Sequence, residues 1–148
     1  MASLFFFGRE VGRLFGGVRL LQLYLAGGVV ASAAHVAWSR REWRQRHPTL
    51  HAAWGAPRGA PALGASGAVN AIVLFDTLLF PWRIILVNFI IPMPAILLGG
   101  AVLMRDAYGT WDASGSGGIA HAAHVGGAAV GAAAWAALQL RTRRMRRW

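Results

Sequence analysis

Four apolar stretches, separated by segments rich in arginine, glycine or proline, limit what this chain can fold into. Each is close to the ~20 residues that a helix needs to cross the ~30 Å hydrocarbon core of a bilayer. The chain is also 56% apolar, which exceeds the usual share in a soluble domain. The sequence therefore predicts an all-α fold in one domain, a polytopic bundle of membrane helices over about residues 18–38, 62–80, 84–104 and 117–139.

The segments outside these stretches are predicted to break the helices. Residues 4–7 are interpreted as the end of a helix, and residues 8–17 as a loop with a short helix, because glycines punctuate them. Pro92 and Pro94 lie inside the third stretch and are expected to kink it. The other predicted non-helical segments are the polar loops 40–58 and 105–116 and the basic tail 141–148.

The charge and the cysteine count exclude several classes of protein. The formal net charge is +10, and every basic residue is an arginine. These arginines lie between apolar stretches and at the C-terminus, which suits membrane-flanking loops better than a nucleic-acid interface. With no cysteine in the chain, a disulfide framework, a thiol nucleophile and a thiolate metal site are all excluded.

A serine and a histidine are predicted to meet inside the membrane. Ser66 lies near the start of the second stretch and His124 near the start of the fourth. Because the third stretch returns the chain, the second and fourth helices should run parallel from the same membrane face. At ~1.5 Å per residue, both side chains would lie roughly 8–10 Å below that face. A serine needs an adjacent base to act as a nucleophile, and a neutral imidazole suits that role.

Small residues around both side chains favour close approach of the two helices. Residues 127–131 form a G-x-x-x-G pattern, which is typical of tightly packed membrane helices. The glycines expected to support the packing and the oxyanion region are Gly64, Gly67, Gly126 and Gly127.

No acidic residue is predicted to join the pair. Asp76 lies ten residues past Ser66, about 15 Å along the helix, and so is too deep. Asp112 is on the correct side of the membrane but is expected in a loop. The sequence therefore predicts a Ser–His dyad without a carboxylate.

Two polar residues near the pair have alternative interpretations. Asn70 is at i+4 from Ser66 and so on the same helix face, where it could contact His124 or substrate; a bond to a neighbouring helix is the preferred interpretation. His121 precedes His124 by three residues, and such a pair can begin a metal site, but no third ligand is evident. No metal and no cofactor are therefore predicted.

The two motifs resemble those of a known family. Gly64-Ala65-Ser66-Gly67-Ala68 and Ala123-His124-Val125-Gly126-Gly127 are similar to the serine and histidine motifs of the rhomboid intramembrane proteases. Residues 63–98 are similar to the plant and algal mitochondrial branch, and the resemblance extends over about residues 4–135. It implies a six-helix core, Ser66 as nucleophile, His124 as general base, cleavage of transmembrane substrates near their helix ends, and a place in the mitochondrial inner membrane.

The beginning of the chain departs from this family. Rhomboids usually carry a histidine and an asparagine on an earlier helix, where they help to stabilise the oxyanion. Met1 would fall just after the expected asparagine, so the chain is interpreted as truncated at its N-terminus. The alternative is a mitochondrial transit peptide over residues 1–24. Because loss of one oxyanion donor can cost about 10²–10³ in rate, little or no turnover is expected of the 148-residue chain.

Three other functions remain as alternatives. The first is a non-catalytic rhomboid-like protein that binds or holds membrane helices. The second is a channel or transporter component, which polar residues inside the membrane suggest. A nucleic-acid binder ranks last. The predicted partners are the lipid bilayer and transmembrane protein substrates, with no nucleic acid.

Overall fold

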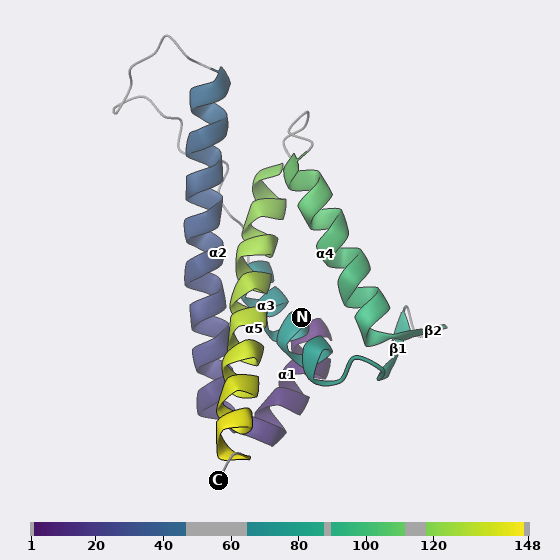
Figure 1. The fold of residues 1–148 in the computed structure, drawn as a ribbon. Coiled ribbons are helices and arrows are strands. Elements are labelled where there is room, and N and C mark those ends of the chain that lie inside the picture. The colour runs from purple at the N-terminus through teal and green to yellow at the C-terminus, as the bar shows by residue number, and fades with distance from the viewer. Residues whose placement is uncertain (1, 47–64, 88–89, 112–117, 147–148) are drawn as a thin grey trace.

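The computed structural model describes residues 2–46, 65–87, 90–111 and 118–146, and over these the chain is mainly helical. Figure 1 shows two long helices side by side, a short helix packed beside them and a fourth helix that leans away. The elements are α1 (Ala2–Phe15), α2 (Gly17–Arg46), α3 (Ser66–Leu79), β1 (Ile84–Val87), β2 (Ile91–Pro94), α4 (Ala95–Trp111) and α5 (Gly118–Met145).

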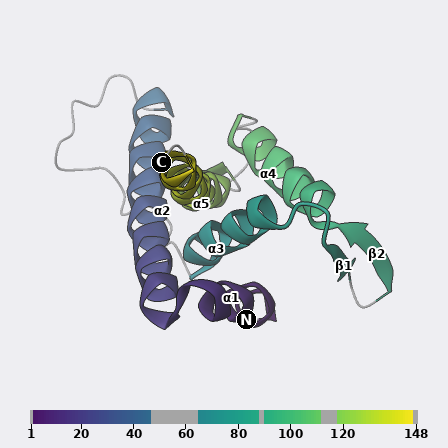
Figure 2. The same ribbon diagram turned by 60° about the horizontal axis from the view of Figure 1, so that its bottom comes forward.

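The helix α3 is the centre of the bundle. It contacts α1, α2, α4 and α5, and in Figure 2 these four helices surround it. The core cluster is formed by Val11, Leu23, Ala71, Ile72 and Phe75. Three of these residues, Ala71, Ile72 and Phe75, belong to α3. Their i, i+1 and i+4 spacing places them on one face of the helix, which is the buried face.

A short turn joins α1 to α2. Gly16 has φ of +86°, a left-handed conformation that glycine adopts without a steric cost. The N–H of Gly16 donates to the carbonyl of Gly12 at 2.9 Å, which closes the end of α1. Phe15, just before the turn, packs edge to face on Phe75 of α3 at 5.5 Å between ring centroids. Residues 4–15 are thus one helix, and the predicted loop over residues 8–17 is wrong except for the turn at its end.

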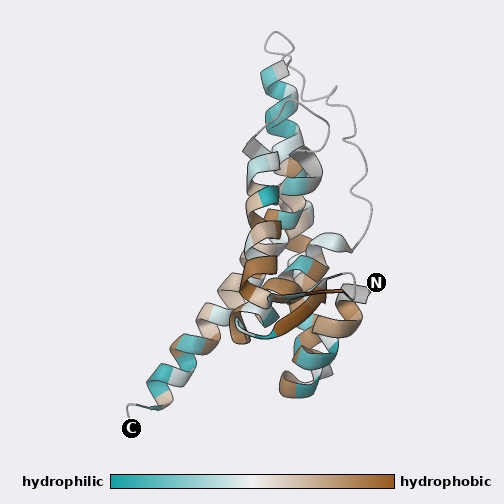
Figure 3. Cartoon of the chain, turned by 90° about the vertical axis from the view of Figure 1, so that its right-hand side faces the viewer, coloured by the Kyte–Doolittle hydropathy of each residue, from teal (hydrophilic) through white to brown (hydrophobic). Residues whose placement is uncertain are grey.

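Two helices are long and apolar enough to cross a membrane in the part of the chain that the structure describes. They occupy residues 17–45 and 121–145. Figure 3 shows hydrophilic residues gathered at the far end of α2 and at the C-terminal end of α5, with hydrophobic residues between them. Many large apolar side chains of α2 are exposed, among them Leu21, Leu25 and Val29, as expected of a helix that faces lipid.

The other two predicted stretches are shorter as helices. The helix α3 has 14 residues and α4 has 17, so neither reaches the length expected of a full span. The helix α5 instead continues to Met145, so most of the predicted basic tail is helical. Residues 47–58 of the predicted first loop, and residues 62–64 of the second stretch, lie outside the described residues.

A helix over residues 84–104 was predicted wrongly, because residues 84–87 and 91–94 form two antiparallel strands. Ile84 pairs with Pro94 and Val87 with Ile91. Proline has no N–H to donate and disfavours helix in the residue before it, so Pro92 and Pro94 prevent a helix here rather than kink one. The helix α4 begins directly after Pro94, where the N–H of Ala95 donates to the carbonyl of Arg83 at 2.8 Å.

An ion pair holds the hairpin against the end of α3. The guanidinium of Arg83 contacts the carboxylate of Asp76, whose side chain is fully buried. The same guanidinium lies 5.9 Å from the ring centroid of Phe7 and 5.3 Å from that of Phe80. Asp76 therefore pairs with Arg83 and does not join Ser66 and His124, as predicted.

Removal of Arg83 should destabilise the bundle. Arg83→Gln leaves the Asp76 carboxylate buried without its cation, which typically costs about 3–5 kcal/mol. The expected result is a loss of that size in the free energy of unfolding, measured by denaturant unfolding in detergent micelles. Arg144→Gln, at an exposed position near the end of α5, is the control and should have little effect. Equal losses in the two variants would contradict the proposed role of the ion pair.

Candidate active site

The structure brings Ser66 and His124 together. The helices α3 and α5 run in the same direction in Figure 1, and both side chains lie in the first two turns of their helices. The Ser66 Oγ lies 3.1 Å from the His124 Nε2, within the 2.6–3.2 Å at which a base can accept a hydroxyl proton. The predicted contact between the two helices is therefore present in the fold.

Glycine makes this close approach of α3 and α5 possible. A Cβ on Gly127 would overlap the carbonyl oxygen of Gly67, and a Cβ on Gly131 would overlap that of Ala71. The backbones of the two helices thus touch along the G-x-x-x-G face. Gly67 also packs against Ala31 of α2, and Gly126 against Ala34 of the same helix. Gly64, the remaining glycine of the predicted set, lies outside the described residues.

A carboxylate lies on the other side of His124, contrary to the predicted dyad without an acid. The Asp106 Oδ2 is 3.1 Å from the His124 Nδ1, and Asp106 has a side chain only 2% exposed. Asp106 was missed because residues 105–116 were predicted to be a loop, whereas α4 extends to Trp111 and carries Asp106 towards α5. Asp112, the acid considered instead, lies outside the described residues.

Asp106 also contacts a second histidine. Its Oδ1 lies 2.7 Å from the His121 Nδ1 and 3.3 Å from a guanidinium nitrogen of Arg105. His121 and His124 are one turn apart on α5, so both rings face α4 and share one carboxylate. His121 is therefore joined to the site through Asp106, which the sequence spacing alone did not indicate.

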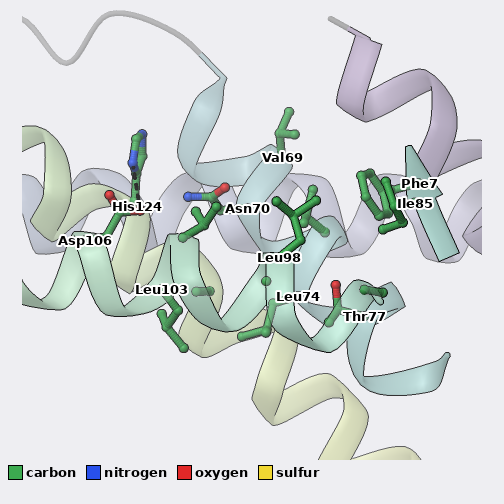
Figure 4. Close-up of a pocket in the computed structure, with 15 residues that line it drawn as sticks. Phe7, Val69, Asn70, Leu74, Thr77, Ile85, Leu98, Leu103, Asp106 and His124 are labelled. Carbon is green, nitrogen blue, oxygen red and sulfur yellow. Dashed lines mark hydrogen bonds and ion pairs between the residues drawn. The ribbon is translucent and has the colours of Figure 1, made fainter. Parts of the chain in front are cut away.

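A cavity of about 220 Å³ opens beside this cluster. Apolar side chains of α3 and α4 form most of its wall, and Figure 4 shows Asp106 and His124 at one end and Phe7 near the other. Asn70 lies next to His124 along the wall, so both residues line the same cavity. An apolar pocket with a few polar groups at one end is typical of a binding site for an apolar side chain.

The chemistry that the site can carry out depends on the two ring nitrogens of His124. If Nδ1–H donates to the Asp106 carboxylate, the lone pair of Nε2 faces the Ser66 hydroxyl and can accept its proton. The helix α3 begins at Ser66, and Ala65 provides no side-chain cap, so the first N–H groups of α3 have no acceptor within the helix. Such free N–H groups, at the positive end of the helix dipole, can stabilise negative charge close to Ser66.

Enlarging a glycine at the helix contact should separate the two side chains. Gly127→Leu forces α5 away from the Gly67 carbonyl, and a displacement of about 1 Å at a reacting centre can cost ~10² in rate. We expect normal membrane insertion with at least that loss in the rate at which a fluorophosphonate labels Ser66. Gly100→Leu is the control, because no atom lies within 4 Å of a Cβ built there. Full reactivity of the Gly127 variant would show that this contact does not position the site.

Comparisons with known proteins agree with the fold and the motifs. A family model described as "Rhomboid domain" matches residues 1–141. The mitochondrial RHOMBOID-like protein 12 of Arabidopsis thaliana is 41% identical over 143 residues, which cover 94% of this chain and 41% of that protein. The chain thus spans well under half the length of this relative. No solved structure matches the chain.

The family match and the apolar helices identify an integral membrane protein, as predicted, and the Arabidopsis relative is named as mitochondrial. The match covers nearly the whole chain, including the serine and histidine motifs. The chain belongs to the rhomboid family.

Proposed function

We propose that the chain is an intramembrane serine endopeptidase that cleaves transmembrane helices. The observation that carries this proposal is the row Ser66–His124–Asp106, with 3.1 Å at each of its two contacts. A hydroxyl, an imidazole and a buried carboxylate in this order form the arrangement that activates serine in unrelated hydrolases. Membership of the rhomboid family supports the same reaction.

The proposed steps use the chain's own groups. His124 Nε2 accepts the Ser66 proton as Oγ attacks the carbonyl carbon of the scissile peptide bond. The oxyanion that forms is stabilised by backbone N–H groups at the start of α3, such as those of Ser66 and Gly67. The imidazolium then protonates the leaving amine, and water hydrolyses the acyl-enzyme by the reverse transfers. Asp106 holds the Nδ1–H of His124 and stabilises the imidazolium.

The cavity beside His124 supports a hydrophobic substrate. Its wall is mainly apolar, and it reaches the catalytic cluster through Asn70 and His124. An apolar side chain of a membrane-spanning helix fits these surroundings, and the Asn70 amide can hydrogen-bond the substrate backbone next to it. The mitochondrial inner membrane is the proposed location, since the relative is mitochondrial and the helices are membrane-spanning.

Cleavage of a panel of single-span membrane proteins in liposomes tests the proposal. We expect the chain to cleave slowly, and a chimera in which it replaces the matching segment of the Arabidopsis relative to cleave faster, because the chimera supplies the remaining length of that protein. Ser66→Ala in each protein is the control. Absence of cleavage by both proteins, across the panel, would favour a rhomboid-like protein that holds membrane helices without cutting them.

A further inference from the structure

We infer that Asp106, His121 and His124 form a binding site for a transition-metal dication, with Zn²⁺ as the best fit, and that the bound ion switches off Ser66. The ion-binding part stands alone, whereas the inhibitory part rests on the proposed function. The three side chains come from two helices, α4 and α5, and each offers a ligand atom. Two imidazoles and one carboxylate are ligands that zinc takes in proteins.

The spacing of the ligand atoms suits a single small ion. All three lie within 4.8 Å of one another. Tetrahedral zinc with bonds of about 2.0–2.1 Å needs ligand atoms about 3.4 Å apart. The His121 Nδ1 and the His124 Nδ1 already lie 2.7 and 3.1 Å from oxygens of Asp106. Small rotations of the three side chains therefore suffice to surround an ion, with the fourth position left for water.

An ion can reach the cluster and be retained there. The side chains of His121 and His124 are 24% and 22% exposed, whereas the Asp106 carboxylate is buried. The only cation that contacts this carboxylate within the described residues, apart from the histidines, is Arg105, whose side chain is 69% exposed. Because this arginine adjoins solvent, it can swing away as a dication takes its place.

The backbone of α4 fixes one of the ligands. A Cβ built on Gly109 would lie 2.6 Å from the His121 Nε2, so the imidazole ring rests directly on the α4 backbone at this glycine. The ring is thereby held with Nδ1 towards Asp106, as a ligand orientated before the ion arrives. A preorganised ligand set binds more tightly, because less side-chain freedom is lost on binding.

Inhibition follows from the tautomer of His124. An ion on Nδ1 requires that this nitrogen carry no proton, so the single proton of the neutral ring moves to Nε2. Nε2–H then points at the Ser66 Oγ as a donor and has no lone pair to accept the hydroxyl proton. The ion also binds the Asp106 carboxylate, which then no longer orients His124 through a hydrogen bond. Serine activation and ion binding thus need opposite tautomers of one histidine.

Metal binding is tested first without any need for activity. The probe is Co²⁺, titrated into the Ser66→Ala chain in detergent micelles and followed by its visible ligand-field absorption, with Zn²⁺ as the competitor. We expect an absorption typical of a low-coordinate nitrogen and oxygen site, displaced by Zn²⁺ in a 1:1 ratio. Adding His121→Gln should weaken cobalt binding at least tenfold, whereas adding His35→Gln, on α2 and outside the cluster, should not. Absence of the absorption, or equal loss in both variants, overturns the site.

Inhibition is tested on the chain with Ser66 intact, by the rate of fluorophosphonate labelling. Zn²⁺ should slow labelling and a chelator should restore it, with Mg²⁺ at the same concentration as the control, because Mg²⁺ prefers oxygen ligands. His121→Gln should raise the half-inhibitory zinc concentration at least tenfold, and Arg105→Gln should lower it. Zinc sensitivity that His121→Gln leaves unchanged overturns the switch. Absence of labelling under all conditions counts against the proposed function, while the cobalt titration still decides the metal site.

Discussion

In the chimera that supplies the remaining length of the Arabidopsis relative, Ser66→Ala should abolish cleavage of membrane substrates, and His124→Ala should do the same. Each variant removes one of two groups that act as a unit across a 3.1 Å contact, so either loss should lower the rate by about 10⁴-fold or more. The double variant should be no worse than either single variant, because there is nothing left for the second substitution to remove.

The matched control is Ser32→Ala. Ser32 lies on α2, and its hydroxyl donates to the carbonyl of Gly28 at 2.8 Å, away from the site. This variant should retain nearly full activity. Losses in the Ser66 and His124 variants that simply add in the double variant would show that the two side chains work independently, which the proposed mechanism does not allow.

Asp106→Asn should produce the second largest loss, about 10²–10⁴ in rate. Asparagine keeps the size of the side chain but can present its NH₂ group to His124 Nδ1, which favours the tautomer that points Nε2–H at Ser66. The expected result is a protein that inserts and folds but labels and cleaves slowly. Asp106→Glu keeps the carboxylate and should recover part of the activity.

His121→Ala separates the two histidines that share Asp106. Among the described residues, His121 makes no hydrogen bond to Ser66, and it reaches His124 through the shared carboxylate and an edge-to-face ring contact at 6.4 Å between centroids. Its loss should therefore cost less than about tenfold in the labelling rate, far below the loss in Asp106→Asn. A His121 variant as inactive as the His124 variant would show that the site needs both rings.

The parts of this fold that could be predicted from the sequence are those that depend on the length of apolar stretches and on the serine, histidine and glycine motifs. The helices α2 and α5 follow from long apolar stretches, and the parallel direction of α3 and α5 follows from counting the intervening segments. The contact of Ser66 with His124 agrees with the prediction that both residues lie near the start of parallel helices. The glycines of residues 127–131 indicate a close helix contact, and they face α3.

The errors have a common physical cause. A short apolar run such as residues 84–94 fits a strand as well as a helix, and only backbone hydrogen bonding across the hairpin decides between them. The polar composition of residues 105–116 resembles that of a loop, although α4 continues for five residues past Asp106, to Trp111. Asp106 meets His121 and His124 only through tertiary packing, so neither the carboxylate nor the third metal ligand could be read from local spacing.

The most direct measurement of the central claim is the site and rate of fluorophosphonate labelling, with the modified residue identified by peptide mass spectrometry. Labelling needs one attack by an activated hydroxyl and does not need efficient turnover, so it reports on Ser66 and its base alone. We expect a single adduct on Ser66, formed quickly in the unaltered chain, slowly in Asp106→Asn and not at all in His124→Ala. An unlabelled Ser66, or labelling at the same rate in His124→Ala, would contradict this expectation.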